Sequence, residues 1–375
     1  MKIYWCTTRH FEGDLCATTQ VAILERLHSL GHDLTVLGPD IPSATHTWEH
    51  IQLNQSSMKG RRAWSLGRSM RTYLKKMNLE ESVLLIDWAL VKPLSSIAEQ
   101  NGAQWLCIDR SPPADANIFA KIQHRVWKKA WALAASSIQK NRGCVGGTVV
   151  SSTHQELITS QFPIQEEKLC ILHAGVDNQL FQQTNRESLG RPIKMVYHGK
   201  MDRNRGILKL LLLVDALENS GIRAELNLIG SGDLAAHLTR LAHSKSNLNY
   251  YGSVQHSEIP EKLQEFEIGL LPMPNLPVWA ISSPLKRSEY ISTGLLVLGI
   301  DHTGHLLPST SNNPEWYRLF DQQSFVDDSI EQIQRWIGGG NFSELSRNAR
   351  KYAESELGWE ITTQSFVELI ESLER

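Results

Sequence analysis

Short apolar runs alternate with amphipathic segments along both halves of the chain. A short apolar run bounded by turn residues is typical of a strand buried on both faces, and apolar residues at helical spacing indicate a helix packed on that sheet. Their alternation predicts βαβ units and parallel sheets. Strands are expected at 2–6, 33–38, 82–87, 105–109, 147–152 and 169–175, and then at 193–199, 224–230, 248–253, 267–272 and 295–300.

A polar stretch with Gly and Pro, residues 182–192, separates the two series of strands and is the expected linker. A chain of 375 residues is also too long for one compact core. We therefore predict two consecutive doubly wound α/β domains, residues 1–185 and 190–357, followed by an amphipathic helix over 358–375 that crosses back to the first domain. In such sheets the ligand is expected at the carboxyl ends of the strands.

Composition indicates a soluble globular protein, with 41% hydrophobic and 21% charged residues. No apolar run reaches the roughly 18 residues that a membrane-spanning helix needs. The chain enters its first expected strand directly after Met1, which leaves no room for a signal peptide. The five cysteines are scattered and form no CxxC pair, so reduced thiols are expected. We therefore expect a cytoplasmic protein.

The charges are distributed unevenly. Residues 1–150 carry 18 Lys/Arg and 12 Asp/Glu, whereas the remainder carries 20 and 28. Within the basic half, residues 60–76 hold six basic residues and no acid, and residues 121–131 interleave four with Trp127 and Trp131. Such segments suit an anionic membrane surface, a phosphorylated acceptor or nucleic acid. They are equally compatible with solvated helices whose tryptophans face the core. We favour peripheral membrane association over nucleic-acid binding.

Two strand ends in the second half carry candidate anion-binding features. HGKMDRNRG (198–206) places Lys200 and Arg205 just before a helix expected from Gly206. Basic side chains beside a helix N-terminus attract anions, although a solvated loop would look the same. LIGSGD (228–233) is a glycine-rich turn with Gly230 and Gly232, which can be a phosphate turn or simply a tight turn.

Two helix starts complete the set of candidates. The segment 250–264 reads as a strand followed by a capped helix from about Ser257. In SPLKRSEYISTG (283–294), Pro284 suits a first helical turn, and Lys286 would present a free backbone N–H. Glu289 could accept two sugar hydroxyls, or it could merely favour the helix N-terminus.

Taken in order, these motifs resemble the nucleotide-sugar domain of retaining GT-B glycosyltransferases of glycosyltransferase family 4. That family carries Gly-Arg-Leu-x-x-x-Lys-Gly after the first strand of the domain, and here the two cations are kept with exchanged identities. The PLKxxEYxxxG stretch, ending in GLLVLG, resembles the nucleotide-binding helix of the family. ILHAGVDNQLF (171–181) and LGWEITTQSFVELIESL (357–373) resemble its interdomain segment and closing helix. The matching positions are Gly199, Lys200, Met201, Arg205 and Gly206, then Gly230 and Gly232, then Tyr251, Gly252, Ser253 and Val254.

The resemblance implies an α/β GT-B fold, with two Rossmann-like doubly wound domains facing each other across a cleft. It implies a retaining hexosyltransferase (EC 2.4) of glycan biosynthesis, which moves a sugar from a nucleoside diphosphate sugar to a glycan or lipid-linked acceptor held by the N-terminal domain. Metal-dependent relatives hold their ion with an Asp-x-Asp triplet, and this chain has none, so we expect no metal and no other cofactor. Lys200 and Arg205 would instead stabilise the leaving diphosphate. The implied donor-binding residues are Gly13, Gly199, Gly230, Gly232, Val254, Ser283, Pro284, Leu285, Lys286 and Glu289.

The sequence departs from the family pattern at two positions. Ile281 stands where the family has the first of two spaced glutamates. The histidine that usually follows the fourth strand is absent, and Asp109 stands near its place. Asp109 could contact the transferred sugar or the acceptor, which would make it a third catalytic residue, or it could serve as a strand-end cap. The departures also leave two other hypotheses open, a non-catalytic GT-B-like binding subunit and a nucleotide-sugar epimerase of the same fold.

Overall fold

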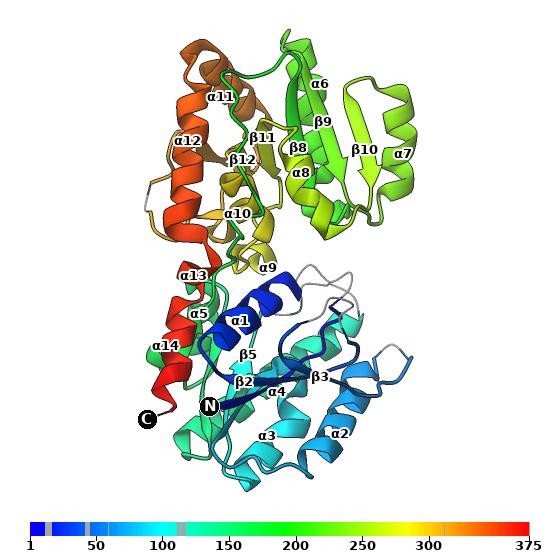
Figure 1. The fold of residues 1–375 in the computed structure, drawn as a ribbon. Helices are drawn as coiled ribbons and strands as arrows, with labels where there is room; N and C mark the ends of the chain where they lie inside the picture. Colours follow the sequence, from blue (N-terminus) through cyan, green and yellow to red (C-terminus); the bar gives the residue numbers. More distant parts are fainter. Residues whose placement is uncertain are drawn as a thin grey trace. The chain divides into compact units, whose positions relative to one another are not determined.

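The structure is a computed structural model of the chain, and it describes residues 1–11, 17–41, 46–58, 60–110, 113, 118–310 and 312–374. The chain divides into two compact units (Figure 1). The N-terminal unit comprises residues 1–173 and 363–375, and the C-terminal unit comprises residues 174–362. Each unit is built on its own parallel sheet.

The N-terminal unit contains a seven-stranded sheet of order β3-β2-β1-β4-β5-β6-β7, with all neighbouring strands parallel. Its strands are β1 (Lys2–Cys6), β2 (Asp33–Gly38), β3 (Glu49–Gln52), β4 (Ser82–Asp87), β5 (Gln104–Ile108), β6 (Cys144–Val149) and β7 (Leu169–Ile171). Its helices are α1 (Ala17–Ser29), α2 (Arg62–Leu74), α3 (Val91–Gln100), α4 (Ile118–Gln139), α5 (Ser152–Gln161) and α14 (Gln364–Ser372).

Both faces of this sheet are buried, because successive strand residues point to opposite sides and both sets are apolar. On β1, Tyr4 belongs to the core beneath α2, α3 and α4, whereas Trp5 belongs to the core beneath α1 and α14. Helix α3 contacts both α2 and α4, so the three helices form one layer (Figure 1). Buried apolar side chains of α14 tie the end of the chain to this unit: Phe366, Val367 and Ile370.

The C-terminal unit contains a six-stranded parallel sheet of order β10-β9-β8-β11-β12-β13. Its strands are β8 (Ile193–His198), β9 (Ala224–Ile229), β10 (Leu248–Gly252), β11 (Ile268–Leu271), β12 (Leu296–Ile300) and β13 (Tyr317–Phe320). Its helices are α6 (Ile207–Asn219), α7 (Ala235–Ser244), α8 (Ile259–Leu263), α9 (Pro277–Ala280), α10 (Leu285–Ser292), α11 (Phe325–Gly339), α12 (Phe342–Tyr352) and α13 (Trp359–Thr362).

The predicted α/β class and parallel sheets are confirmed, and each expected strand is present within a few residues of its predicted position. The expected strand at 147–152 in fact begins at Cys144 and ends at Val149, because Ser151 caps α5 by accepting a hydrogen bond from the His154 backbone N–H. Two strands were not predicted, β3 and β13. Both lie at a sheet edge, where one side of the strand is open and a continuous apolar run is not required.

Residues 174–185, which were expected in the first domain, pack with the C-terminal unit. Val176 forms an isolated parallel bridge with Gly358, and Phe181 is buried in the core of this unit. Arg350 holds the same segment by donating hydrogen bonds to the backbone oxygens of Asn178 and Phe181. The two units therefore divide between 173 and 174 and again between 362 and 363, within the terminal helical region that was expected to start at 358.

Candidate functional site

Glycines pack two strand-end loops against each other at the carboxyl edge of the C-terminal sheet. Gly199 follows β8 with φ 124°, and Gly230 follows β9 with φ 136°, a region that favours glycine. A Cβ on Gly230 would lie 1.8 Å from the carbonyl oxygen of Gly199. A Cβ on Gly232 would lie 2.4 Å from Asp202 Oδ1. These glycines are therefore needed for the close approach of the loops, whatever they also do for a ligand.

A buried lysine lies beside these loops. Lys286, in the first turn of α10, is only 9% exposed, and its Nζ stands 4.1 Å from the centre of the Tyr197 ring. A Cβ on Gly199 would be 3.0 Å from that Nζ, so the ammonium group points at the β8 loop. Burial, followed by the charge of Arg205, lowers the pKa of Lys286 to about 7, against the opposing effect of Glu289. No carboxylate of the described residues lies within 4.0 Å of this nitrogen.

Arg205 is the second cation at this edge. It ends a 3₁₀ helix (Arg203–Arg205), and its guanidinium lies over the Trp279 ring, 4.6 Å from the ring centre. Its Nε is 3.7 Å from Asp202 Oδ2, a loose ion pair. Lys200 is exposed, and its backbone oxygen accepts a hydrogen bond from the Tyr197 hydroxyl. The sequence indicated two cations, Lys200 and Arg205. The structure adds the ammonium group of Lys286, which is more buried than both of them.

Glu289 is a buried carboxylate flanked by two imidazoles. It is 4% exposed, with His198 Nε2 3.0 Å from its Oε2 and His256 Nε2 3.4 Å from its Oε1. Burial alone would raise the pKa of Glu289, but the two histidines outweigh it and lower the pKa to about 2. The hydrogen bond to Glu289 in turn raises the pKa of His256. Neither histidine was assigned a role from sequence, because only the folded loops show that they meet at Glu289.

The SPLKRSEYISTG stretch forms α10, with every residue from Lys286 to Ser292 buried. Pro284 differs from the prediction: it precedes the helix with ψ 125° and does not lie in the first turn. Ser283 is already engaged, since its hydroxyl accepts hydrogen bonds from the Ala174 backbone N–H and from Arg287 Nη2. Leu285 is the first helical residue. The helix is thus part of the core, and its N-terminal turn is the part that can meet a ligand.

Two other predicted positions of the C-terminal unit are apolar. Val254, in the loop after β10, is partly buried against the core of the unit. Ile281, where the resembling family has a glutamate, is 7% exposed. A buried isoleucine cannot accept a hydrogen bond from a sugar hydroxyl, so this part of the site differs chemically from the family pattern.

Asp109 lies in the interior of the N-terminal unit. It is fully buried, and its Oδ2 accepts hydrogen bonds from Trp127 Nε1 at 2.5 Å and Trp131 Nε1 at 2.8 Å. His154 Nε2 lies 3.4 Å from the same oxygen. Burial raises the pKa of Asp109, but His154 and the two indole donors lower it by more than burial raises it, so the net shift is downward. This setting favours a structural anchor over a substrate contact. Gly13, the remaining predicted position of this unit, lies outside the described residues.

The two basic segments of the N-terminal unit form helices with different faces. On α4, Trp127 and Trp131 are buried, so the interpretation in which these tryptophans face the core is correct. On α2, Trp64 is 59% exposed, with Arg68 stacked 4.9 Å from its ring centre. The exposed basic residues of the two segments are Arg61, Arg62, Arg68, Lys75, Lys76, Lys121, Arg125, Lys128 and Lys129.

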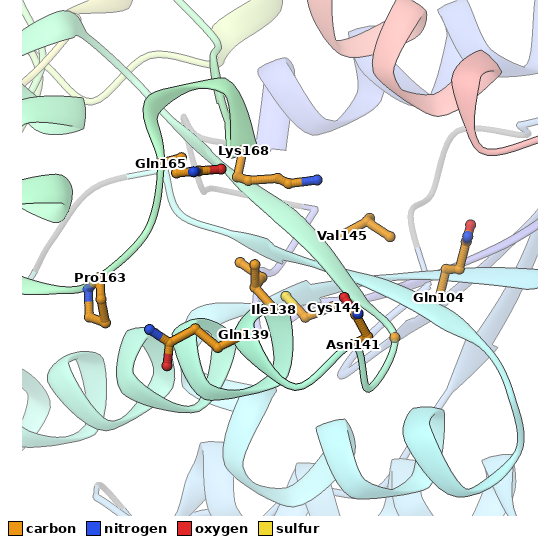
Figure 2. A pocket seen from close by; sticks show the side chains of 10 residues that line it. Gln104, Ile138, Gln139, Asn141, Cys144, Val145, Pro163, Gln165 and Lys168 are labelled. Carbon is orange, nitrogen blue, oxygen red and sulfur yellow. The ribbon is translucent and has the colours of Figure 1, made fainter.

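A pocket of about 660 Å³ opens at the edge of the N-terminal sheet where the strands begin (Figure 2). Gln104 and Cys144, which line it, are the first residues of β5 and β6, so the pocket lies at the amino ends of the strands. Burial raises the pKa of the Cys144 thiol to about 12, so Cys144 is not a thiolate nucleophile at neutral pH. None of the predicted site residues lines this pocket.

Within the described ranges, no three His, Cys, Asp or Glu side chains are grouped so that they could hold a metal ion. Over the same residues, no helix is both long and apolar enough to span a bilayer.

Comparison with known proteins identifies the fold. No protein-family model matches the chain, and no curated protein matches it in sequence. Several solved structures can be superposed on nearly the whole length of this chain. Sucrose-phosphate synthase from Thermosynechococcus elongatus is 15% identical with a TM-score of 0.76, covering 99% of this chain and 98% of its own. Anabaena HepE, solved with UDP and glucose, is 11% identical with a TM-score of 0.72, covering 99% and 100%. A glycosyltransferase from Rickettsia africae is 14% identical with a TM-score of 0.70, covering 99% and 98%. The chain therefore has the GT-B fold, as the sequence resemblance implied.

Proposed function

We propose that this chain is a glycosyltransferase that moves a sugar from a nucleoside diphosphate sugar to an acceptor hydroxyl. The observation that carries the proposal is the combination at the carboxyl edge of the C-terminal sheet: Lys286 buried with no carboxylate partner among the described residues, Arg205 beside it, and a buried ionised Glu289. A nucleoside diphosphate sugar has the complementary groups, a dianionic diphosphate and a ribose diol. The proteins of similar fold support the same class of reaction, and HepE was solved with UDP and glucose.

The cations would act on the leaving group. When the bond between the sugar C1 and the diphosphate oxygen breaks, negative charge develops on the diphosphate, and preorganised cations in a site screened from water stabilise it. Lys286 on α10 and Arg205 in the segment after β8 would take this role, with Lys200 more exposed in the same segment. Burial, followed by the charge of Arg205, disfavours the charged form of Lys286, and a bound diphosphate would oppose both effects.

The remaining donor contacts follow the carboxyl edge of the sheet. Glu289 would accept hydrogen bonds from the ribose hydroxyls, and the loop containing Val254 would contact the base. The N-terminal turn of α10 offers backbone N–H groups to the phosphates. The proposed donor-binding residues are Gly199, Gly230, Gly232, Val254, Ser283, Pro284, Leu285, Lys286 and Glu289.

The finer description of the reaction is also part of the proposal. The new bond forms between C1 and the acceptor oxygen with retention of configuration, and the acceptor proton passes to the departing diphosphate. We propose that no metal ion is needed, that a hexose is transferred, and that the acceptor is a glycan or a lipid-linked molecule held by the N-terminal unit. The exposed basic residues of α2 and α4 would bring this unit to an anionic membrane surface.

A two-step experiment tests the proposal. Thermal-shift screening of the full chain against UDP-, GDP- and ADP-sugars should find one nucleotide sugar that stabilises the protein. Release of the nucleoside diphosphate from this donor should then persist in EDTA. Arg205→Ala or Lys200→Ala should lower kcat by roughly 10²-fold or more if each cation stabilises leaving-group charge. Arg240→Ala, an exposed arginine on α7, serves as the control and should retain full activity. Stabilisation without turnover would support a non-catalytic binding subunit, and unchanged rates in the cation variants would contradict the proposed mechanism.

A further inference from the structure

Two histidines from separate segments of the C-terminal unit flank Glu289, the buried carboxylate of the proposed donor site. His198 is the last residue of β8, and His256 lies in the 3₁₀ helix (His256–Glu258) after β10. Their Nε2 atoms approach different oxygens of Glu289, Oε2 at 3.0 Å and Oε1 at 3.4 Å. Neither histidine is among the matching positions that carry the family resemblance, so their role must come from this geometry.

The segments that carry the two histidines are held in place by further contacts. The His198 backbone N–H donates to the Tyr290 hydroxyl at 3.1 Å, and the two rings meet edge to face at 5.2 Å. The His256 loop is closed by a reciprocal cap in which the Gln255 backbone N–H donates to Glu258 Oε2 at 2.9 Å. His198 and the segment that carries His256 are therefore held by contacts other than those with Glu289.

The carboxylate retains unused acceptor capacity. A carboxylate offers about four acceptor positions on its two oxygens. His256 occupies one of them on Oε1. Among the described residues, Oε2 accepts no well-aligned hydrogen bond although it is buried and His198 is near. A buried acceptor without a donor is costly, and two neighbouring hydroxyl donors would satisfy this group.

We propose that His256 and His198 are positioning residues that fix Glu289 as an oriented anion, and that this fixed carboxylate selects a ribose diol over a 2′-deoxyribose. The inference rests on the proposed function, because the diol is that of the nucleotide bound at this edge. Without the imidazoles, Glu289 would be buried with no cation within ion-pair distance among the described residues. It would then take up a proton more readily and present one donor in place of an acceptor.

The test compares binding of one nucleotide with that of its 2′-deoxy counterpart. Isothermal titration first identifies which of UDP, GDP or ADP binds the full-length protein most tightly. We expect the wild type to bind this nucleotide about tenfold or more tightly than the 2′-deoxy form, since a hydrogen bond to a charged group contributes at least this much. His256→Leu should reduce that ratio to about twofold or less, and His256→Gln, which keeps an N–H donor, should restore most of it.

His243→Leu on α7 is the matched control, because His243 is exposed and its Nδ1 lies 2.7 Å from the Thr239 backbone oxygen of its own helix. The ratio of the two affinities reports the ribose contact, and a general loss of stability would not change it selectively. Unchanged discrimination in His256→Leu would overturn this inference alone. Equal binding of the two nucleotides by the wild type would overturn the ribose contact of Glu289, and binding of no nucleotide would overturn the proposed function as well.

Discussion

Replacing Asp109 by alanine should destabilise the N-terminal unit strongly without touching the proposed donor site. The carboxylate is fully buried and accepts two indole hydrogen bonds on one oxygen, from Trp127 and Trp131. Asp109→Ala removes the acceptor and leaves both N–H groups buried without it. Hydrogen bonds to charged groups contribute about 1.5–3 kcal/mol each, and breaking a buried charged cluster costs about 3–5 kcal/mol. We therefore expect a loss of about 4 kcal/mol, a large part of the usual 5–15 kcal/mol of domain stability.

Asp109→Asn provides a graded comparison. An amide oxygen can still accept from both indoles, but without the charge that makes such bonds roughly twice as strong, so a loss of about 2 kcal/mol is expected. The measurement is urea unfolding followed by tryptophan fluorescence. Glu156→Ala, on the exposed face of α5, serves as the control and should stay within about 0.5 kcal/mol of the wild type.

The same experiment separates the two interpretations of Asp109 that the sequence left open. Unfolding of Asp109→Ala at the wild-type urea concentration would refute the structural account of this residue. A folded, fully stable Asp109→Asn that binds the nucleotide sugar but fails to transfer would restore the catalytic interpretation.

Three further predictions concern other parts of the molecule. Gly230→Ala should abolish nucleotide binding in thermal-shift assays and lower the melting temperature, because its Cβ would lie 1.8 Å from the Gly199 carbonyl oxygen; normal binding would contradict that packing. The pKa of Glu289 is lowered to about 2 from its usual 4.5, so its ionisation stabilises the folded state above pH 4.5 and this contribution is lost as the pH falls towards 2. Wild type and Glu289→Gln should therefore converge in melting temperature over that range, and a constant difference would argue against the ionised, histidine-paired carboxylate. Co-sedimentation with anionic liposomes at low salt should fall when Arg62 and Arg68 on α2 are both changed to Glu, whereas no wild-type binding would remove the membrane proposal.

The buried parallel strands could be predicted because each is an apolar run, which can be recognised in the sequence without knowing the neighbouring strands. Strands β3 and β13, each at one edge of its sheet, could not, since they carry mixed residues such as Glu49 and Arg318. The same limit applies to α4. Its basic residues are visible in the sequence, but only the fold shows that Trp127 and Trp131 point inward to Asp109, 18 and 22 positions earlier in the chain.

The candidate site shows a similar division. Gly199, Gly230 and the α10 stretch could be proposed as candidates because turn glycines and helix starts leave local signals in the sequence. The pairing of His198 and His256 with Glu289 joins positions 91 and 33 residues from it, and no local pattern encodes such a meeting. The low pKa of Lys286 likewise depends on burial and on the neighbouring charge of Arg205, which become visible only in the folded unit.

The most direct test of the central claim is titration of the full-length protein with nucleoside diphosphate sugars, with release of the nucleoside diphosphate measured on the same samples. We predict that one member of a UDP-, GDP- and ADP-sugar panel binds and is turned over, and that Lys286→Met weakens binding of that donor while Arg240→Ala leaves it unchanged. Failure of every donor in the panel to bind the wild type, or equal binding by Lys286→Met, would contradict the proposed donor site.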